Sequence, residues 1–321
     1  MRKNERYFRH NIYAFSFDIC PTMKISVVIP VYNAERYVES AVDSALHQKE
    51  TAEILLVEDN SPDNALVVCE KLSHEHPRVR LIRHRDGKNH GAGESRNLGI
   101  REAQYDHVAF LDADDYYLKN CFSKAVEVFN DDPTVDGVYA AVGVEFENEE
   151  AKRRYFLTHY EEIATVDEKV TPKELFRFLV LGGAGYIHLN GLVVKKAGLL
   201  KVGLLPKLRL HQDSVLTIKL AAALKLVAGE IHTPVSLRRI HLENRITDLK
   251  TNFSETNFRA AQYLLRWSKE QNLSVEKKRI IRGYYWAHGF RYYRKAKKYP
   301  LDPRAIYYFA VSRLFGNGYR T

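Results

Sequence analysis

Apolar runs of strand length alternate with amphipathic helical segments through the first 145 residues of this 321-residue chain. Such alternation at short spacing predicts right-handed βαβ units, and therefore a parallel, doubly wound sheet covered by helices on both faces. Strands are expected at 25–30, 54–57, 79–82, 108–111 and 137–144, and helices at 35–48, 61–72, 93–103 and 118–129. The helix at 61–72 is expected because Ser61-Pro62 places a cap residue before a proline at the first helical position.

The pattern loosens after residue 145. A charged stretch to about 173 precedes a Gly-rich segment at 181–185, a strand-like run at 191–194 and a helix at 213–228. Residues from 251 onward are expected to be mostly helical. We therefore predict one large α/β domain over 23–250, with halves 23–145 and 146–250, followed by a helical C-terminal region at 251–321.

Residues 1–22 are basic, but Asn11 and Asp18 interrupt their apolar residues. They match neither a signal peptide nor a membrane span, so we expect an extension that is untranslated or disordered, with Met23 as a candidate start. The three cysteines lie far apart and form no C-x-x-C, which is typical of a reducing compartment. No run of 18 apolar residues occurs. We expect a cytoplasmic protein.

The net charge of +9 is concentrated at the C-terminal end. Residues 251–321 hold 15 Lys/Arg against 4 Asp/Glu, together with 16 aromatic residues. One interpretation is a helical region that packs its aromatic side chains on the main domain and exposes a basic face. The other is peripheral contact with an anionic membrane. No nucleic-acid-binding motif accompanies the charge, so we expect no nucleic acid partner.

Three acidic residues lie within four consecutive positions directly after an apolar run. Asp112-Ala113-Asp114-Asp115 follows Val108–Leu111, which predicts a buried strand with carboxylates at its C-terminal end. Open α/β sheets bind their ligands at that end. A hard divalent cation offsets the repulsion between such carboxylates, so the sequence predicts Mg²⁺ or Mn²⁺ held by Asp114 and Asp112. The structural alternative is an acidic turn that closes a strand.

Four separated segments match one family pattern in order and spacing. They are Ser26-Val27-Val28-Ile29-Pro30-Val31-Tyr32-Asn33, the run 53–63 around Glu58-Asp59, the run 91–99 from Gly91 to Gly99, and Phe110–Asp115. Over residues 24–245 the chain resembles the inverting family 2 glycosyltransferases, which have the GT-A fold. Glu58 stands where the family usually has Asp.

The resemblance implies a role for each matching segment. The nucleotide sugar is expected to contact Pro30, Val31, Tyr32, Asn33, Asp59, Arg96, Asp112, Ala113 and His241. An aromatic ring such as Tyr32 can lie against a base, and a carboxylate such as Asp59 can accept from a base N–H or a ribose hydroxyl. A guanidinium in the first turn of a helix, as at Arg96, can neutralise a diphosphate or hold the acidic motif.

Each of these residues also has a purely structural interpretation. Asp59 can cap the following helix near Ser61, and Arg96 can pair on the surface with Glu94 or Glu102. His241 can be a satisfied structural histidine. Asp115 is expected either to support the metal ligands or to cap a helix.

A second chemical site is predicted at Leu210-His211-Gln212-Asp213. It resembles the family's Glu-Asp pair, with Gln212 in place of the Glu, and implies Asp213 as the general base. Inversion requires such a group, because the acceptor hydroxyl loses its proton as it attacks the anomeric carbon. The structural alternative for Asp213 is a helix N-cap.

Processive relatives carry Q-x-x-R-W, whereas Gln262 to Trp267 has one residue too many, so we expect transfer of a single sugar. The resemblance implies a UDP-sugar donor and a glycan or glycolipid acceptor, and together with the basic C-terminal region it implies bacterial lipopolysaccharide or capsule biosynthesis. Two alternatives are a non-catalytic nucleotide-sugar-binding or scaffold protein and a sugar-nucleotidyltransferase. The latter needs a Gly-rich loop where Pro30–Asn33 stands.

Overall fold

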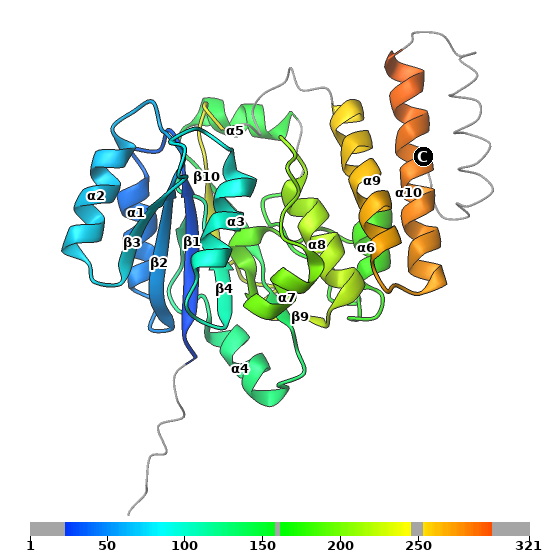
Figure 1. The fold of residues 1–321 in the computed structure, drawn as a ribbon, viewed down its shortest axis with the longest axis horizontal. Coiled ribbons are helices and arrows are strands. Elements are labelled where there is room, and N and C mark those ends of the chain that lie inside the picture. The colour runs from blue at the N-terminus through cyan, green and yellow to red at the C-terminus, as the bar shows by residue number, and fades with distance from the viewer. Residues whose placement is uncertain (1–22, 158–160, 245–252, 297–321) are drawn as a thin grey trace, which may run out of the picture.

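The computed structural model describes residues 23–157, 161–244 and 253–296. Its centre is a seven-stranded sheet in the order β3-β2-β1-β4-β8-β6-β9 (Figure 1). The strands are β1 (Ile25–Val31), β2 (Thr51–Glu58), β3 (Val79–Arg83), β4 (His107–Phe110), β6 (Gly137–Tyr139), β8 (Leu192–Lys195) and β9 (Leu226–Ala228). Only β8 runs antiparallel to its neighbours in this sheet. The mostly parallel, doubly wound α/β fold is confirmed.

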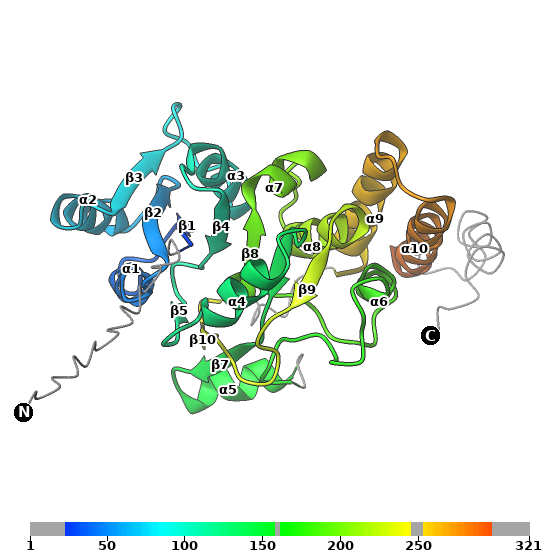
Figure 2. The same cartoon turned by 90° about the horizontal axis from the view of Figure 1, so that it is seen from below.

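Successive residues of the central strands belong to two different cores. Val28 and Phe110 face one core, whereas Val27, Ile29 and Ala109 face the other. All seven residues of β1 are buried, as expected for a strand covered on both faces. Figure 2 shows α1 and α4 on one side of the sheet and α3 and α7 on the other.

The helices of the first half are α1 (Val38–Leu46), α2 (Ala65–Glu75), α3 (Ala92–Glu102) and α4 (Ser123–Asp131). Three of them, α1, α2 and α4, begin three to five residues later than the sequence predicts, whereas α3 begins one residue earlier. Ser61-Pro62 does not start α2, because the Ser61 N–H donates to the Glu58 carboxylate at 2.6 Å and the helix begins after Asn64. Before α4, Tyr116–Tyr117 forms a short strand, β5, and residues 118–122, predicted as the first helical turn, are not helical.

The strand predicted at 137–144 is wrong as a single element. The chain leaves the main sheet after β6 and enters a second sheet as β7 (Val142–Phe146). That sheet has the order β5-β10-β7, where β10 is Ser236–Ile240. The second sheet brings the end of β10 beside the acidic segment that follows β4, because the Arg239 N–H donates to Asp115 at 2.8 Å.

The second half is more regular than its sequence pattern indicates. It contains α5 (Glu149–Phe156), α6 (Leu175–Leu181), α7 (Lys196–Val202) and α8 (Gln212–Ala223). The predicted helix at 213–228 ends at Ala223, and the remainder forms β9. Three of these helices were not predicted because α5 is mostly polar and α6 and α7 are only seven residues long.

The C-terminal region is helical as predicted, over the part that the structure describes. It consists of α9 (Phe253–Glu270) and α10 (Val275–Ala296), which lie side by side next to α6 and α8 (Figure 1). Trp267 donates its indole N–H to the Val202 carbonyl at 2.9 Å, and Phe258 stacks on Tyr285. The predicted extension 1–22 and the end of the chain after 296 lie outside the described residues. In the described part, no helix is both long and apolar enough to cross a membrane.

Candidate active site

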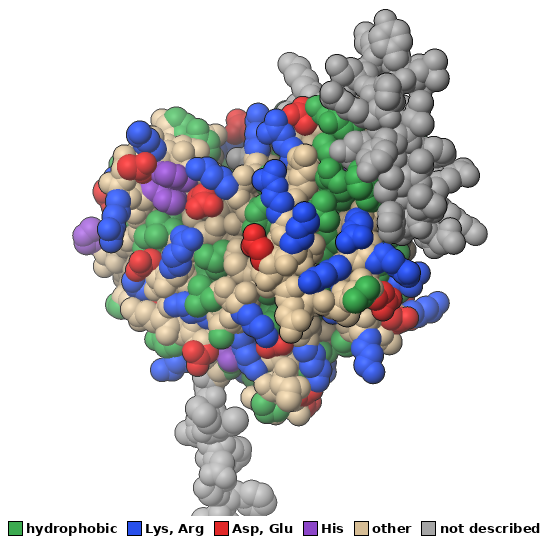
Figure 3. All heavy atoms as spheres, turned by 45° about the vertical axis from the view of Figure 1, so that its right-hand side comes forward, with side chains coloured by type: hydrophobic (Ala, Val, Ile, Leu, Met, Phe, Trp, Pro, Cys, Tyr) green, Lys and Arg blue, Asp and Glu red, His purple; other side chains and the backbone are tan. Residues whose placement is uncertain are grey.

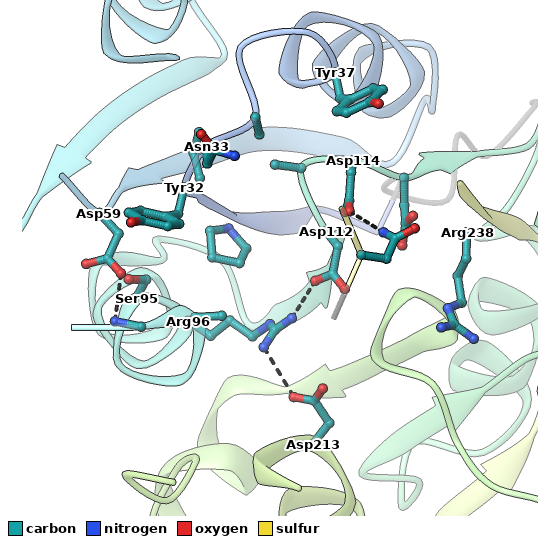
Figure 4. A pocket seen from close by; sticks show the side chains of 18 of the residues that line it. Tyr32, Asn33, Tyr37, Asp59, Ser95, Arg96, Asp112, Asp114, Asp213 and Arg238 are labelled. Atoms are coloured by element: carbon teal, nitrogen blue, oxygen red, sulfur yellow. Dashed lines mark hydrogen bonds and ion pairs between the residues drawn. The ribbon is translucent and has the colours of Figure 1, made fainter. Parts of the chain in front are cut away.

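Every predicted site residue lines one cavity of about 520 Å³. The cavity lies at the C-terminal ends of β1, β2 and β4, where parallel α/β sheets bind ligands, and β10 and the start of α8 close its other side. It collects Pro30, Val31, Tyr32, Asn33, Asp59, Arg96, Asp112, Ala113, Asp114, Asp213 and His241. Figure 4 shows Tyr32, Asn33 and Asp59 at one end, the acidic segment in the middle and Arg238 at the far end.

At the first end, Asp59 is buried and organises the loop before α3. Its two carboxylate oxygens accept the backbone N–H groups of His90 and Gly91, each at 2.7 Å. It therefore does not cap the helix near Ser61. Tyr32 is 48% exposed and lines the cavity, where its ring can contact a planar ligand.

In the middle, Arg96 joins the two predicted chemical sites. Its guanidinium forms an ion pair with Asp112 and another with Asp213, the latter at 3.2 Å from Nη1 to Oδ1 (Figure 4). Arg96 is 3% exposed, so it is not a surface residue that pairs with Glu94 or Glu102. A planar fork of donors suits this bridging position, since it can serve two carboxylates at once.

The ion pairs of Arg96 favour the charged forms of Arg96 and Asp112. Burial opposes ionisation of Asp112, but the charge and hydrogen bond of Arg96, together with His188 and Arg238, outweigh it and hold the pKa of that carboxyl below its usual value. Burial also opposes the charge of Arg96, and Asp213 and Asp112 raise the pKa of the guanidinium above its usual value. The three side chains thus form a charged unit at the floor of the cavity.

Asp213 is not the N-cap of α8. That position belongs to His211, whose backbone adopts a left-handed conformation with φ of 63°. Asp213 lies in the first helical turn with 44% of its side chain exposed, and it faces the cavity from the side opposite to the acidic segment (Figure 4). A carboxylate that is both oriented by a partner and reachable from the cavity can accept a proton from a bound hydroxyl.

Asp114 and His241 meet across the two sheets. The Nε2 atom of His241 lies 3.2 Å from Asp114 Oδ2, and the side-chain amide of Asn244 donates to the same oxygen at 3.0 Å. His241 is 6% exposed and stacks on Tyr37 at 4.9 Å between ring centroids. Oxygen and imidazole nitrogen atoms suit a divalent cation.

The protein provides only a partial coordination shell for such a cation. No group of three His, Cys, Asp or Glu side chains within the described ranges is arranged to hold a metal by itself. This still fits Mg²⁺ or Mn²⁺, since Mg²⁺ usually binds one or two carboxylates and takes its other ligands from water and substrate phosphates. Asp114 keeps 31% of its side chain exposed toward the cavity for that purpose.

Asp115 supports the site from behind. It accepts the side-chain amide of Asn190 at 2.6 Å and the backbone N–H of Arg239 at 2.8 Å. Burial, with the adjacent Asp114 and Asp112, raises its pKa well above the usual value. Asn190 also accepts the Asp112 N–H at 3.2 Å, so one buried amide fixes both ends of the acidic segment.

Sequence reasoning missed His188 and Arg238, which line the far end of the cavity. Burial and the charge of Arg238 lower the pKa of His188 to about 3, so the imidazole is neutral at neutral pH. Its Nδ1 accepts the Asn190 N–H at 3.2 Å, which places the ring proton on Nε2. Arg238 lies three residues before the predicted His241, and this proximity in sequence was the available signal. His188 follows no recognisable pattern.

The chain matches a known family over just over half of its length. The sequence profile described as "Glycosyl transferase family 2" matches residues 26–188. An "Uncharacterized glycosyltransferase" of Haemophilus influenzae is 25% identical over 284 residues, which cover 87% of this chain and 89% of that protein. The "Uncharacterized glycosyltransferase EpsJ" of Bacillus subtilis is 34% identical over 104 residues, but that stretch covers 32% of this chain and only 29% of EpsJ.

Solved structures show the same fold. TarS residues 1–349 of S. aureus, in a structure titled as a complex with UDP-GlcNAc, superposes with a TM-score of 0.64 at 19% identity. The superposition covers 91% of this chain and 81% of the TarS chain. At this identity the likeness establishes the GT-A architecture alone. The family profile, together with the mostly parallel sheet and its acidic edge, places this chain among the family 2 glycosyltransferases.

Proposed function

We propose that the chain transfers one hexose or N-acetylhexosamine from a UDP-sugar to a glycan or glycolipid acceptor, with inversion at the anomeric carbon. The observation that supports this most directly is the bridge made by Arg96, which holds Asp112 and Asp213 at one cavity. An inverting transfer needs a donor site and a base on opposite sides of the reacting carbon. Asp112 and Asp213 reach the cavity from opposite sides.

The donor is proposed to lie along the cavity from Asp59 toward Arg238. The nucleoside would take the end formed by Tyr32, Asn33 and Asp59, and the diphosphate would lie near Asp112, Asp114 and His241. UDP is the proposed nucleotide because TarS, in the structure named above, is titled as bound to UDP-GlcNAc. The sugar would then extend toward His188 and Arg238.

Asp114 and His241 would hold a divalent cation, with Asp112 beside it. A mannosyltransferase from Pyrobaculum calidifontis, with a TM-score of 0.52, is titled as a complex with GDP-Man and Mn²⁺. Such a cation stabilises negative charge on a departing diphosphate. Side chains of the protein carry out the remaining steps. Asp213 takes the proton from the acceptor hydroxyl, and Arg96 fixes the position of that carboxylate.

The proposed biological setting is a bacterial surface polysaccharide assembled at the cytoplasmic face of the inner membrane. The "Minor teichoic acid biosynthesis protein GgaB" of Bacillus subtilis is 30% identical over 109 residues, which are only 12% of its length. Exposed arginines on α10, such as Arg279, Arg282 and Arg291, support peripheral contact with anionic lipid. Figure 3 shows Lys and Arg side chains widely spread over the face that carries α9 and α10. Co-sedimentation with phosphatidylglycerol but not phosphatidylcholine vesicles is the expected result.

The donor and metal sites are tested by thermal shift with UDP, GDP, CMP and dTDP, each with and without Mn²⁺. A ligand at a hundred times its dissociation constant stabilises a protein by about 2.7 kcal/mol. We expect a Mn²⁺-dependent shift with UDP that Asp114→Ala abolishes and Asp131→Ala, at the exposed end of α4, retains. No shift with any nucleotide would contradict the proposal. UDP release from UDP-sugars in the presence of an acceptor then separates a transferase from a binding protein.

A further inference from the structure

A second cavity of about 350 Å³ adjoins the donor cavity. We call it the side cavity. It lies between the start of α3, at Asn89, Gly91 and Ala92, and the segment that carries Lys207 and Arg209. Both cavities are lined by Asn89, Gly91, Ala92, Arg209 and Gln212. The side cavity therefore joins the donor cavity along the start of α3 and at Gln212, the chain neighbour of the proposed base Asp213.

The loop that forms the outer wall of the side cavity is firmly anchored. Asn97 of α3 donates to the Leu205 carbonyl at 3.0 Å and accepts the Leu205 N–H at 2.9 Å. Lys219 of α8 donates to the carbonyls of Gly203 and Leu204 at 3.0 and 2.6 Å. Three of these four hydrogen bonds are buried and the fourth is partly buried, which makes the loop a fixed part of the fold rather than a loose connection.

The side cavity is lined with unpaired positive charge. The side chains of Lys207 and Arg209 are exposed and, among the described residues, make no hydrogen bond or ion pair. In the described part of the lining, Glu94 is the single carboxylate, and it accepts the Asn97 amide at 3.3 Å. The lining also includes His90, whose Nε2 lies 2.8 Å from Asp86.

Two helix N-termini add to this charge. The first residues of α3 and of α8, at Ala92 and Gln212, both line the side cavity, so two helix dipoles direct their positive ends toward it. Gln212 is 8% exposed, and its side-chain amide has no hydrogen-bond partner in the described part of the chain. An amide without a partner in the lining of a cavity is available to a polar ligand.

We propose that the acceptor carries a phosphate group, which binds in the side cavity between Lys207 and Arg209. This inference rests on the proposed function and specifies its acceptor class. A ligand anchored there can present a hydroxyl to Asp213 through the opening beside Gln212. The hydroxyl oxygen bonds to the anomeric carbon, the bond from that carbon to the diphosphate breaks, UDP leaves, and the proton goes to Asp213. The acceptor phosphate itself does not react.

The test is isothermal titration of sn-glycerol 3-phosphate, with glycerol as its uncharged match, into full-length protein saturated with UDP and Mg²⁺. We expect the phosphate ester to bind and glycerol not to bind. The double variant Lys207→Ala/Arg209→Ala is expected to weaken this binding by about tenfold or more, because charge-assisted contacts to phosphate are lost. Lys201→Ala, another exposed lysine near the end of α7, is the control and should bind like the wild type.

UDP affinity, measured first, distinguishes a failure of the proposed donor site from a failure of the proposed phosphate site. If UDP binds but the phosphate ester does not, the anionic acceptor is excluded and the donor site stands. If the double variant loses UDP affinity as well, the two cations serve the donor diphosphate and this inference is wrong. A wild type that binds neither ligand contradicts the proposed function together with the inference.

Discussion

Arg96 and Asp213 form an ion pair although 117 residues separate them in the chain. The contact joins α3, which packs against the parallel sheet, to α8, which begins at the far wall of the cavity. Arg96 also pairs with Asp112 at the end of β4, so three elements depend on one guanidinium. The position of the proposed base is therefore set by the same residue that holds the acidic segment.

Arg96→Lys is expected to show whether the site needs only a positive charge at this position or also the planar geometry of the guanidinium. A lysine keeps the positive charge but offers a single ammonium group, which cannot form two planar contacts at once. Arg96→Met removes the charge from a buried position and is expected to lower the free energy of unfolding by about 3 kcal/mol. Urea denaturation measures the change in the free energy of unfolding, and UDP titration measures the change in the donor site. A lysine variant with wild-type turnover would show that the fork geometry is unimportant.

Asp213→Asn is expected to reduce kcat by about 10²–10⁴-fold, the usual contribution of a general base, while UDP affinity changes little. The amide retains the shape of the side chain, and Arg96 keeps its partner Asp112. Steady-state turnover and UDP titration on the same preparation provide the measurement. Asp136→Asn, remote from the cavity at the start of β6, is the control. Equal losses of kcat and UDP affinity would assign Asp213 to donor binding instead.

The sequence was sufficient for the parallel strands β1 to β4 and for the two halves of the cavity, because buried strands and strand-end carboxylates have local signatures. It could not show that Arg96 would bridge them, since ion pairs between distant elements leave no periodic pattern. The break between β6 and β7 also escaped prediction. Gly137–Val144 is apolar throughout, and only tertiary pairing with β8 and β10 divides it. The division into domains and the site roles remain predictions.

Gly99→Ala is expected to destabilise the protein, although alanine is the better helix former. A Cβ atom at Gly99 would lie 2.4 Å from Val28 Cγ1 and 3.2 Å from Val57 Cγ2, both in buried strands that cannot move aside. Overpacking of this kind costs about 1–3 kcal/mol. Since α3 carries Arg96, the shift should also lower turnover. Thermal unfolding measures the loss, with the exposed neighbour Glu102→Ala as control.

Lys219 gives the protein a testable response to pH. Its ammonium group is fully buried, and burial lowers its pKa to about 8, compared with about 10.4 for lysine in an unfolded chain. Between these values the unfolded state binds more protons than the folded state, so the free energy of unfolding rises with pH across this window. A neutral amine still has two N–H groups for the carbonyls of Gly203 and Leu204.

Lys219→Met isolates this contribution. It is expected to destabilise the protein because two buried carbonyls lose their donor, at about 1–3 kcal/mol. The stability difference between wild type and variant should then grow by about 3 kcal/mol in favour of the wild type from pH 7.5 to pH 10.5, as 1.36 kcal/mol corresponds to one pKa unit. Denaturant titrations across this range provide the measurement. A difference that stays constant with pH would mean that Lys219 has the same pKa in both states, and that the rings of Tyr263 and Trp267 beside its ammonium group offset the cost of burial.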